Sequence, residues 1–207
     1  MPSLDGPSPD RSSAPDPVAA LVDRAAITDC LLRYARGCDR VDAELIASAF
    51  HDDAVDLHGP VNGSVVEFLD WWLPQQAGRE STQHYLMNMA VDVDGDQAHV
   101  ETYYLCVIKL KDHPLASIVG GRYVDRFERR AIGWRIAVRV VTADWTVEAD
   151  GSGTAAILAS TPGRRSADDP SYERPLLRSR PDPAGGPAAE RPGGQATRRD
   201  LNEPNET

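Results

Sequence analysis

The chain has 207 residues and a formal net charge of −10. Residues 18–148 alone carry 20 acidic and 13 basic side chains, and such a surface repels nucleic-acid phosphates and anionic membranes. No apolar run approaches the roughly 18 residues of a membrane span, and the N-terminus lacks the apolar stretch of a signal peptide. We therefore expect a cytoplasmic protein that binds neither nucleic acid nor membrane.

The prolines divide the chain into three parts. Five of the sixteen lie in residues 1–17 and eight in residues 149–207, whereas a packed core tolerates few. We expect a disordered N-terminal arm over 1–17, a folded domain over 18–148 and a mostly disordered Pro/Gly/Arg-rich tail over 149–207. Within that tail, the stretch around Tyr172 to Leu177 could add a strand or a partner contact.

Helical patterns come first along the chain. Residues 18–38 repeat apolar side chains at steps of three and four, which predicts a helix with one buried face. Asp42 can cap a second, short helix over residues 43–50. A third helix is expected over residues 65–76, where Trp72 belongs to the apolar stripe.

Strand patterns follow. A short strand is expected over residues 54–58, and the turn Asp94-Gly95-Asp96 is a strong hairpin signal between two of four later strands. Helices followed by an antiparallel meander predict an α+β fold. We expect a cone-shaped α+β barrel, in which three N-terminal helices cover a curved, mostly antiparallel sheet. Its long strands are predicted over residues 81–93, 97–110, 116–129 and 134–147.

The concave side of such a sheet, closed by helices, forms an apolar pocket, which is the usual place for a ligand. Strand alternation places His84, Leu86 and Asn88 on one face of the strand over residues 81–93. The opposite, convex face would then carry Tyr85, Met87, Met89 and Val91.

Asp39 and His84 form the candidate acid–base pair. The carboxylate would fix the tautomer of the imidazole, which can take a proton near neutral pH. Arg139, in the middle of the last strand, could stabilise negative charge or a leaving group, and Tyr34 could donate a hydrogen bond to a substrate oxygen. Each residue also has a structural alternative. His84 could be a structural strand histidine and Asp39 a turn cap. Arg139 could form a surface ion pair, and Tyr34 could be a core residue.

The sequence predicts neither a metal nor a cofactor. No serine or cysteine stands in a nucleophile motif, and no spacing of His, Asp and Glu indicates metal ligands. The three cysteines, Cys30, Cys38 and Cys106, lack metal-ligand or CxxC spacing, and their odd number argues against a disulfide framework. The helical pattern around Cys30 and Cys38 indicates that these two pack in the core.

Several short motifs carry a resemblance to the SnoaL-like group of the nuclear transport factor 2-like superfamily. It spans about Val22 to Trp145. Among characterised members the chain is similar to hexachlorocyclohexane dehydrochlorinase, and more distantly to scytalone dehydratase and bile-acid dehydratase. The motifs are Arg24-Ala-Ala-Ile, Tyr34-Ala-Arg-Gly-Cys-Asp39, Phe50-His-Asp-Asp-Ala, Thr82-Gln-His84-Tyr, and Gly120-Gly-Arg-Tyr-Val-Asp-Arg-Phe-Glu-Arg-Arg130 followed by Trp134.

The resemblance implies a chemistry. In the dehydrochlorinase an Asp–His dyad removes a proton and an Arg assists the leaving group, and motif position carries these roles to Asp39, His84 and Arg139. Tyr34 replaces a pocket Lys and Asp56 replaces a pocket Trp, which favours an oxygenated substrate. We expect a cofactor-independent, dehydratase-type lyase for a mid-sized apolar oxygenated molecule. Its expected substrate-binding residues are Asp56, Trp72, Leu86 and Asn88.

Two other classes of function stay open. An isomerase or a polyketide-type cyclase could use the same dyad, and a non-catalytic binding or accessory protein could keep only the pocket. The resemblance also implies a homo-oligomer, a dimer or trimer, for which the convex face with Tyr85, Met87 and Met89 offers apolar surface.

Overall fold

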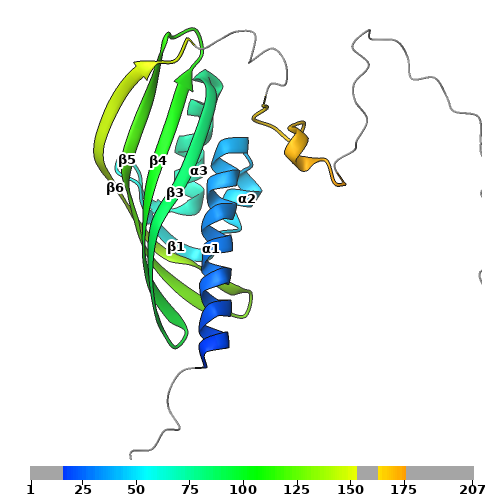
Figure 1. The fold of residues 1–207 in the computed structure, drawn as a ribbon, viewed down its shortest axis with the longest axis vertical. Coiled ribbons are helices and arrows are strands. Elements are labelled where there is room, and N and C mark those ends of the chain that lie inside the picture. Colours follow the sequence, from blue (N-terminus) through cyan, green and yellow to red (C-terminus); the bar gives the residue numbers. More distant parts are fainter. Residues whose placement is uncertain (1–15, 153–162, 176–207) are drawn as a thin grey trace, which may run out of the picture. The chain divides into compact units, whose positions relative to one another are not determined.

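The computed structural model describes residues 16–152 and 163–175 (Figure 1). The expectations for 1–15, 153–162 and 176–207 lie outside the described residues. No helix in the described part is long and apolar enough to cross a membrane. The helices are α1 (Pro17–Arg40), α2 (Ala43–Ala47) and α3 (Val65–Gln75), with 3-10 turns η1 (Gln76–Gly78) and η2 (Pro170–Tyr172); the strands are β1 (Phe50–Leu57), β2 (Asn62–Ser64), β3 (Arg79–Asp94), β4 (Gln97–Leu110), β5 (Leu115–Arg130) and β6 (Gly133–Asp150).

The α1–α2 connection turns sharply and brings the end of α1 toward the sheet. Val41 ends α1 in the left-handed conformation with a φ of 55°, and the Asp42 side chain then accepts a hydrogen bond from Leu45 N at 2.9 Å. Gly37 lets the two helices approach, since a Cβ there would lie 2.7 Å from Ile46 Cγ1. The cap predicted at Asp42 is confirmed.

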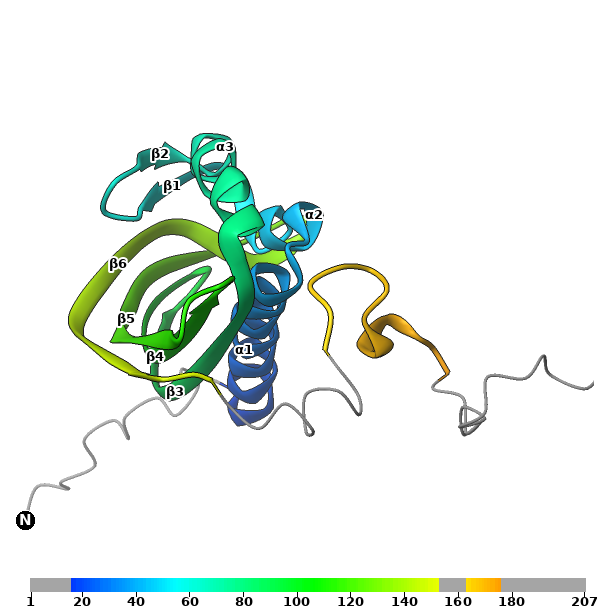
Figure 2. The ribbon, with the colours of Figure 1, turned by 90° about the horizontal axis from the view of Figure 1, so that it is seen from above.

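The six strands form one sheet in the order β2-β1-β6-β5-β4-β3. The pairing of β1 with β6 is parallel and the others are antiparallel. Figure 2 shows the sheet curling from β3 round to β6, with α1 beside β3 and α3 next to β1 and β2. The predicted α+β cone, with three helices and a curved, mostly antiparallel sheet, is confirmed.

Two local expectations were wrong. The second helix ends at Ala47 rather than Phe50, because Phe50 pairs with Ile136 and begins β1. The short strand β2 was not predicted, because Asn62-Gly63-Ser64 carries no apolar alternation.

A β-bulge at Asn88 changes which side chains of β3 face the core. The register with β4 shifts between Met87 and Met89, and Asn88 has a positive φ of 29°. Before the bulge, His84 points inward as expected. After it, Met89 and Val91 pack toward the core rather than lying on the convex face. Tyr85 and Met87 are exposed there, and the dimer or trimer stays a prediction.

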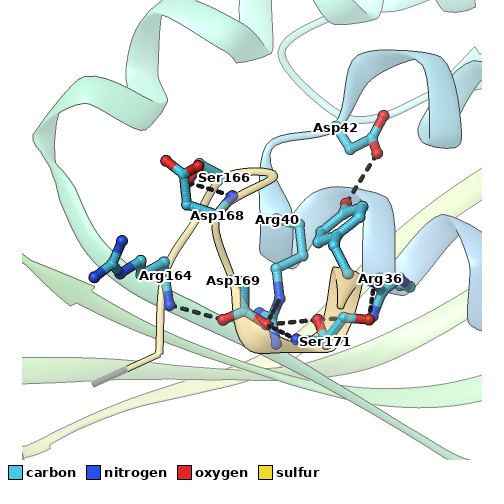
Figure 3. Close-up of polar contacts among 9 residues, drawn as sticks. Arg36, Arg40, Asp42, Arg164, Ser166, Asp168, Asp169 and Ser171 are labelled. Atoms are coloured by element: carbon cyan, nitrogen blue, oxygen red, sulfur yellow. Dashed lines mark hydrogen bonds and ion pairs between the residues drawn. The ribbon is translucent and has the colours of Figure 1, made fainter. Parts of the chain in front are cut away.

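Residues 163–173 pack against α1 and α2 through polar contacts (Figure 3). Asp169 is 5% exposed, forms an ion pair with Arg40 at 3.2 Å and accepts a hydrogen bond from Arg164 N at 2.8 Å. Tyr172 donates its hydroxyl to Asp42 Oδ2 at 2.9 Å. The described part of the Tyr172–Leu177 stretch thus holds no strand and contacts the chain's own helices instead.

The segment reaches η1 and β3 through Arg165. Its Nη2 donates to Gln76 Oε1 at 2.8 Å and to Thr82 Oγ1 at 3.1 Å. Thr82 stands two residues before His84 on β3, so the segment braces the strand that carries the candidate base.

Replacing Asp169 with Ala should release this segment. The carboxylate accepts several hydrogen bonds, beginning with that from Ser171, which hold its pKa well below its usual range. Losing them should speed tryptic cleavage after Arg164 and Arg165 by about tenfold. This corresponds to a decrease of about 1.4 kcal/mol in the free energy of local opening. Mass spectrometry of the digest measures this; Asp168→Ala, an exposed neighbour, is the control, and equal cleavage in both variants would disprove the docking.

Candidate active site

Asp39 and His84 meet at the C-terminal end of α1. His84 Nδ1 lies 2.7 Å from Asp39 Oδ1, and the backbone N–H of His84 donates to Asp39 Oδ2 at 3.0 Å. Both carboxylate oxygens are thus engaged by one residue, which fixes the orientation of the ring. Nδ1 is turned to the carboxylate, so Nε2 is the nitrogen free for chemistry.

The environment favours the protonated form of His84. Burial by itself would lower the pKa of the imidazole, but the hydrogen bond with Asp39 and the influence of the Cys106 side chain outweigh it and raise the pKa to about 9. Cys106 is the direct cross-strand neighbour of His84 on β4. Near neutral pH the resting pair is therefore an imidazolium beside a carboxylate.

His84 borders a cavity of about 150 Å³ under α3. Most of its wall is aromatic or aliphatic, and three side chains on it carry or can take a positive charge: His58, Arg79 and His84. The cavity is small beside the roughly 300–1,000 Å³ of most ligand sites. The remaining lining residues are Trp71, Trp72, Tyr104, Cys106, Ile108, Val119, Tyr123 and Val141.

Larger hollows lie elsewhere on the surface. In one of about 420 Å³, half of the lining residues are charged, namely Arg79, Glu80, Lys111 and Arg165. We take the smaller cavity as the candidate site, because it combines a largely apolar wall with the paired histidine.

A second Asp–His pair reaches the same cavity. His58 follows the end of β1 and lies with Nδ1 3.2 Å from Asp56 Oδ2. Its ring stacks on Phe68 of α3 at a centroid distance of 4.6 Å. Asp56 itself is fully buried behind His58 and does not line the cavity.

Arg139 lies beneath the cavity floor. It is fully buried and donates from Nε and Nη2 to the two carboxylate oxygens of Asp125, at 2.8 and 2.7 Å. Its guanidinium lies 4.3 Å from the ring centroid of Tyr34 and 4.1 Å from that of Tyr123. Although burial opposes the charge, Asp125 and the surrounding groups hold the pKa of Arg139 well above its usual value.

The expected site residues are thus only partly brought together. Tyr34 is buried against Arg139, and Leu86 packs against the core, so neither lines the cavity. The bulge leaves Asn88 exposed and away from the cavity. Of the residues expected to contact substrate, His84 and Trp72 form part of the wall.

The sequence reasoning missed two cavity residues, His58 and Cys106, and only His58 carried a usable signal. Alternation from the buried Ala54 and Asp56 puts His58 on the same strand face. Cys106 was harder to find, since a regular hairpin from Asp94-Gly95-Asp96 would pair His84 with Val107. The bulge shifts that register by one residue and sets Cys106 opposite His84. Among residues 16–152 and 163–175 no cluster of three His, Cys, Asp or Glu is arranged to hold a metal ion.

The family is shown by a match of residues 19–140 to the SnoaL-like domain. The chain belongs to this SnoaL-like family. The comparison with curated proteins gives no match.

Solved structures share the fold. Hexachlorocyclohexane dehydrochlorinase LinA-type3 from Novosphingobium barchaimii is 21% identical with a TM-score of 0.59, covering 66% of this chain and 96% of its own. A candidate scytalone dehydratase from Novosphingobium aromaticivorans is 20% identical with a TM-score of 0.59, covering 63% and 89%. A candidate aromatic ring hydroxylase from the same species is 27% identical with a TM-score of 0.57, covering 62% and 94%.

The raised pKa of His84 makes stability depend on pH. The folded pKa of about 9 exceeds the ordinary 6.5, so the stabilisation is complete below pH 6.5 and is lost as the pH rises through 9. The free energy of unfolding should fall by up to about 3 kcal/mol over that range. Asp39→Asn should flatten the curve, whereas the exposed Asp29→Asn should not; urea unfolding at several pH values measures this, and parallel curves for all three proteins would contradict it.

The Asp125–Arg139 pair should be costly to break. Asp125→Asn would leave the guanidinium buried without its partner and should lower the free energy of unfolding by about 3–5 kcal/mol. Asp144→Asn removes the exposed pair with Arg122 and should cost less than about 1 kcal/mol. Urea unfolding compares the two, and equal losses would show that the buried pair is not a structural requirement.

Proposed function

We propose that the protein is a cofactor-independent acid–base lyase that eliminates a small group from an apolar, oxygenated molecule. The observation that carries the proposal is the Asp39–His84 pair on the wall of a largely apolar cavity. A base that must remove a proton from carbon gains from such surroundings, since an apolar wall limits the water that would compete for it and screen the charge that develops. The cavity volume favours the smaller members of this substrate class.

Proton removal would begin from neutral His84. Its Nε2 would take a proton from a carbon next to a carbonyl, while Asp39 stabilises the imidazolium that forms. A pKa of about 9 leaves roughly one ring in a hundred neutral at pH 7, so activity should rise with pH toward that value. The neutral form of His84 is thus rare near neutral pH, but it is a strong base because its conjugate acid has a high pKa.

The negative charge that develops on the substrate needs a counter-charge. Arg79 is the cation at the cavity wall and is the candidate for this role. Arg139, expected to contact the leaving group, acts at most through the ring of Tyr123, which stacks on Tyr104 at a centroid distance of 4.5 Å.

Two structural relatives support elimination over other chemistry. A dehydrochlorinase and a candidate dehydratase share the fold, and both names describe the loss of a small group from carbon. An isomerase or cyclase would use the same base without losing mass, so the mass of the product separates these reactions from a lyase. A binding protein would keep the cavity and show no proton transfer at His84.

A nitrobenzisoxazole tests the base directly, because its ring opens when any positioned base removes one proton from carbon. His84→Ala should lower kcat/KM by about a hundredfold or more, and Asp39→Asn by a smaller factor. The wild-type rate should rise with pH and level off near pH 9, as the pKa of His84 requires.

His113→Gln is the matched control, since His113 is exposed and bonds only to nearby backbone. Circular dichroism checks that each variant is folded. A folded His84→Ala variant with full activity would exclude His84 as the base, and so would a rate that does not change with pH.

A further inference from the structure

We propose that His58, held by Asp56, is a second catalytic residue that protonates the departing oxygen while His84 removes the proton from carbon. The inference rests on the proposed lyase function and names the acid that such a reaction needs. Hydroxide is a poor leaving group, so loss of water from an alcohol is slow unless its oxygen is protonated as the bond breaks.

The sheet brings the two histidines to one cavity from different walls. His58 follows β1, near one edge of the sheet, and His84 lies on β3, the strand at the other edge. Three strands separate β1 from β3 in a sheet that curls (Figure 2), and both His58 and His84 border the same cavity. A molecule in the cavity can therefore meet one histidine at its acidic carbon and the other at its leaving group.

Three contacts hold the His58 ring. Nδ1 faces Asp56 Oδ2 at 3.2 Å, the ring stacks on Phe68 with an interplanar angle of 27°, and the backbone N–H donates to Val61 O at 2.9 Å. Nε2 makes no hydrogen bond to any residue that the structure describes. An imidazole bound to a carboxylate through one nitrogen, with the other free, has the arrangement of an acid–base histidine.

His51 provides an internal comparison. It lies on β1 as well, but is 3% exposed, does not border the cavity and bonds through Nε2 to Glu128 O at 2.9 Å. That is the pattern of a structural histidine bound to the backbone. His58 differs from it because it lines the cavity and pairs with a carboxylate rather than with a backbone carbonyl.

Asp56 lies opposite the buried Arg139 in the sheet. It is the register partner of Arg139 on the adjacent parallel strand. Asp56 Oδ1 and Arg139 Nη1 are both buried and lack a hydrogen-bond partner among the described residues. Among the described residues, the one side-chain hydrogen bond of the Asp56 carboxylate is thus with the His58 ring, which makes Asp56 the positioning residue of the second pair.

The proposed step balances without a co-reactant. His84 Nε2 takes the proton from carbon, the C–H electron pair forms the C=C bond, and the C–O bond breaks. His58 Nε2–H gives its proton to the departing oxygen, and water leaves. The ring of His84 ends protonated and that of His58 neutral, and exchange with solvent restores both.

Leaving-group dependence tests the role of His58. The probes are an aryl β-hydroxy ketone and the β-chloro ketone of the same carbon skeleton, which give the same enone. Chloride leaves without a proton, so His58→Gln should lower kcat/KM for the hydroxy ketone by about a hundredfold and that for the chloro ketone by less than about threefold. Asp56→Asn should shift the same ratio in the same direction by a smaller factor.

His113→Gln is again the control and should leave both rates unchanged. Because each variant is compared with itself on two probes, a loss of folded protein lowers both rates and leaves the ratio intact; His58→Asn repeats the test if the Gln variant does not fold. An unchanged ratio in folded His58 variants, with His84→Ala still inactive on the chloro ketone, would overturn the role of His58 alone. Activity of His84→Ala on the chloro ketone would instead overturn the proposed function.

Discussion

The ion pair between Arg139 and Asp125 lies where most elements of the domain meet. It joins β5 to β6, and the aromatic rings of Tyr34, Phe50 and Tyr123 surround the guanidinium, which brings in α1 and β1. A buried charge without such contacts would cost several kcal/mol, so the packing around it must keep one geometry. That geometry holds Tyr123, which lines the cavity, against the guanidinium, and the backbone register sets Asp56 opposite Arg139 on the adjacent strand.

The curvature of the sheet decides what reaches this cavity. Bulges interrupt β3 at Asn88 and shift the pairing of β5 with β6, and such bulges bend a strand and increase its twist. A flat sheet would keep β1 and β3 apart, whereas the curled sheet lets His58 and His84 border one space. Under the proposed mechanism, the two Asp–His pairs would supply the base and the acid that elimination of water requires.

Several features followed directly from local sequence. Periodicity located the three helices and the long strands, since apolar spacing reports which face of an element is buried. The contact of Asp39 with His84 also agreed with expectation, although its catalytic role stays a proposal that rests on the resemblance. Strict alternation failed at the bulges: it put Asn88 in the pocket and Met89 outside, and it concealed Cys106. A single inserted residue reverses which side chains face each side of the strand, and no local sequence pattern predicts the position of such a bulge.

The sequence by itself thus determined the element types, the α+β class and the choice of Asp39 and His84, because these depend on neighbours along the chain or on motifs. The tertiary structure alone decided the depth of each side chain. Arg139 and Tyr34 could have faced a substrate on periodicity, but three-dimensional packing buries them beneath the cavity. In the sequence His58 is an ordinary residue at the end of a strand, and only the folded sheet brings it to the cavity that His84 also borders. The reason is physical: alternation gives direction relative to a strand, whereas a cavity is made by residues distant in sequence.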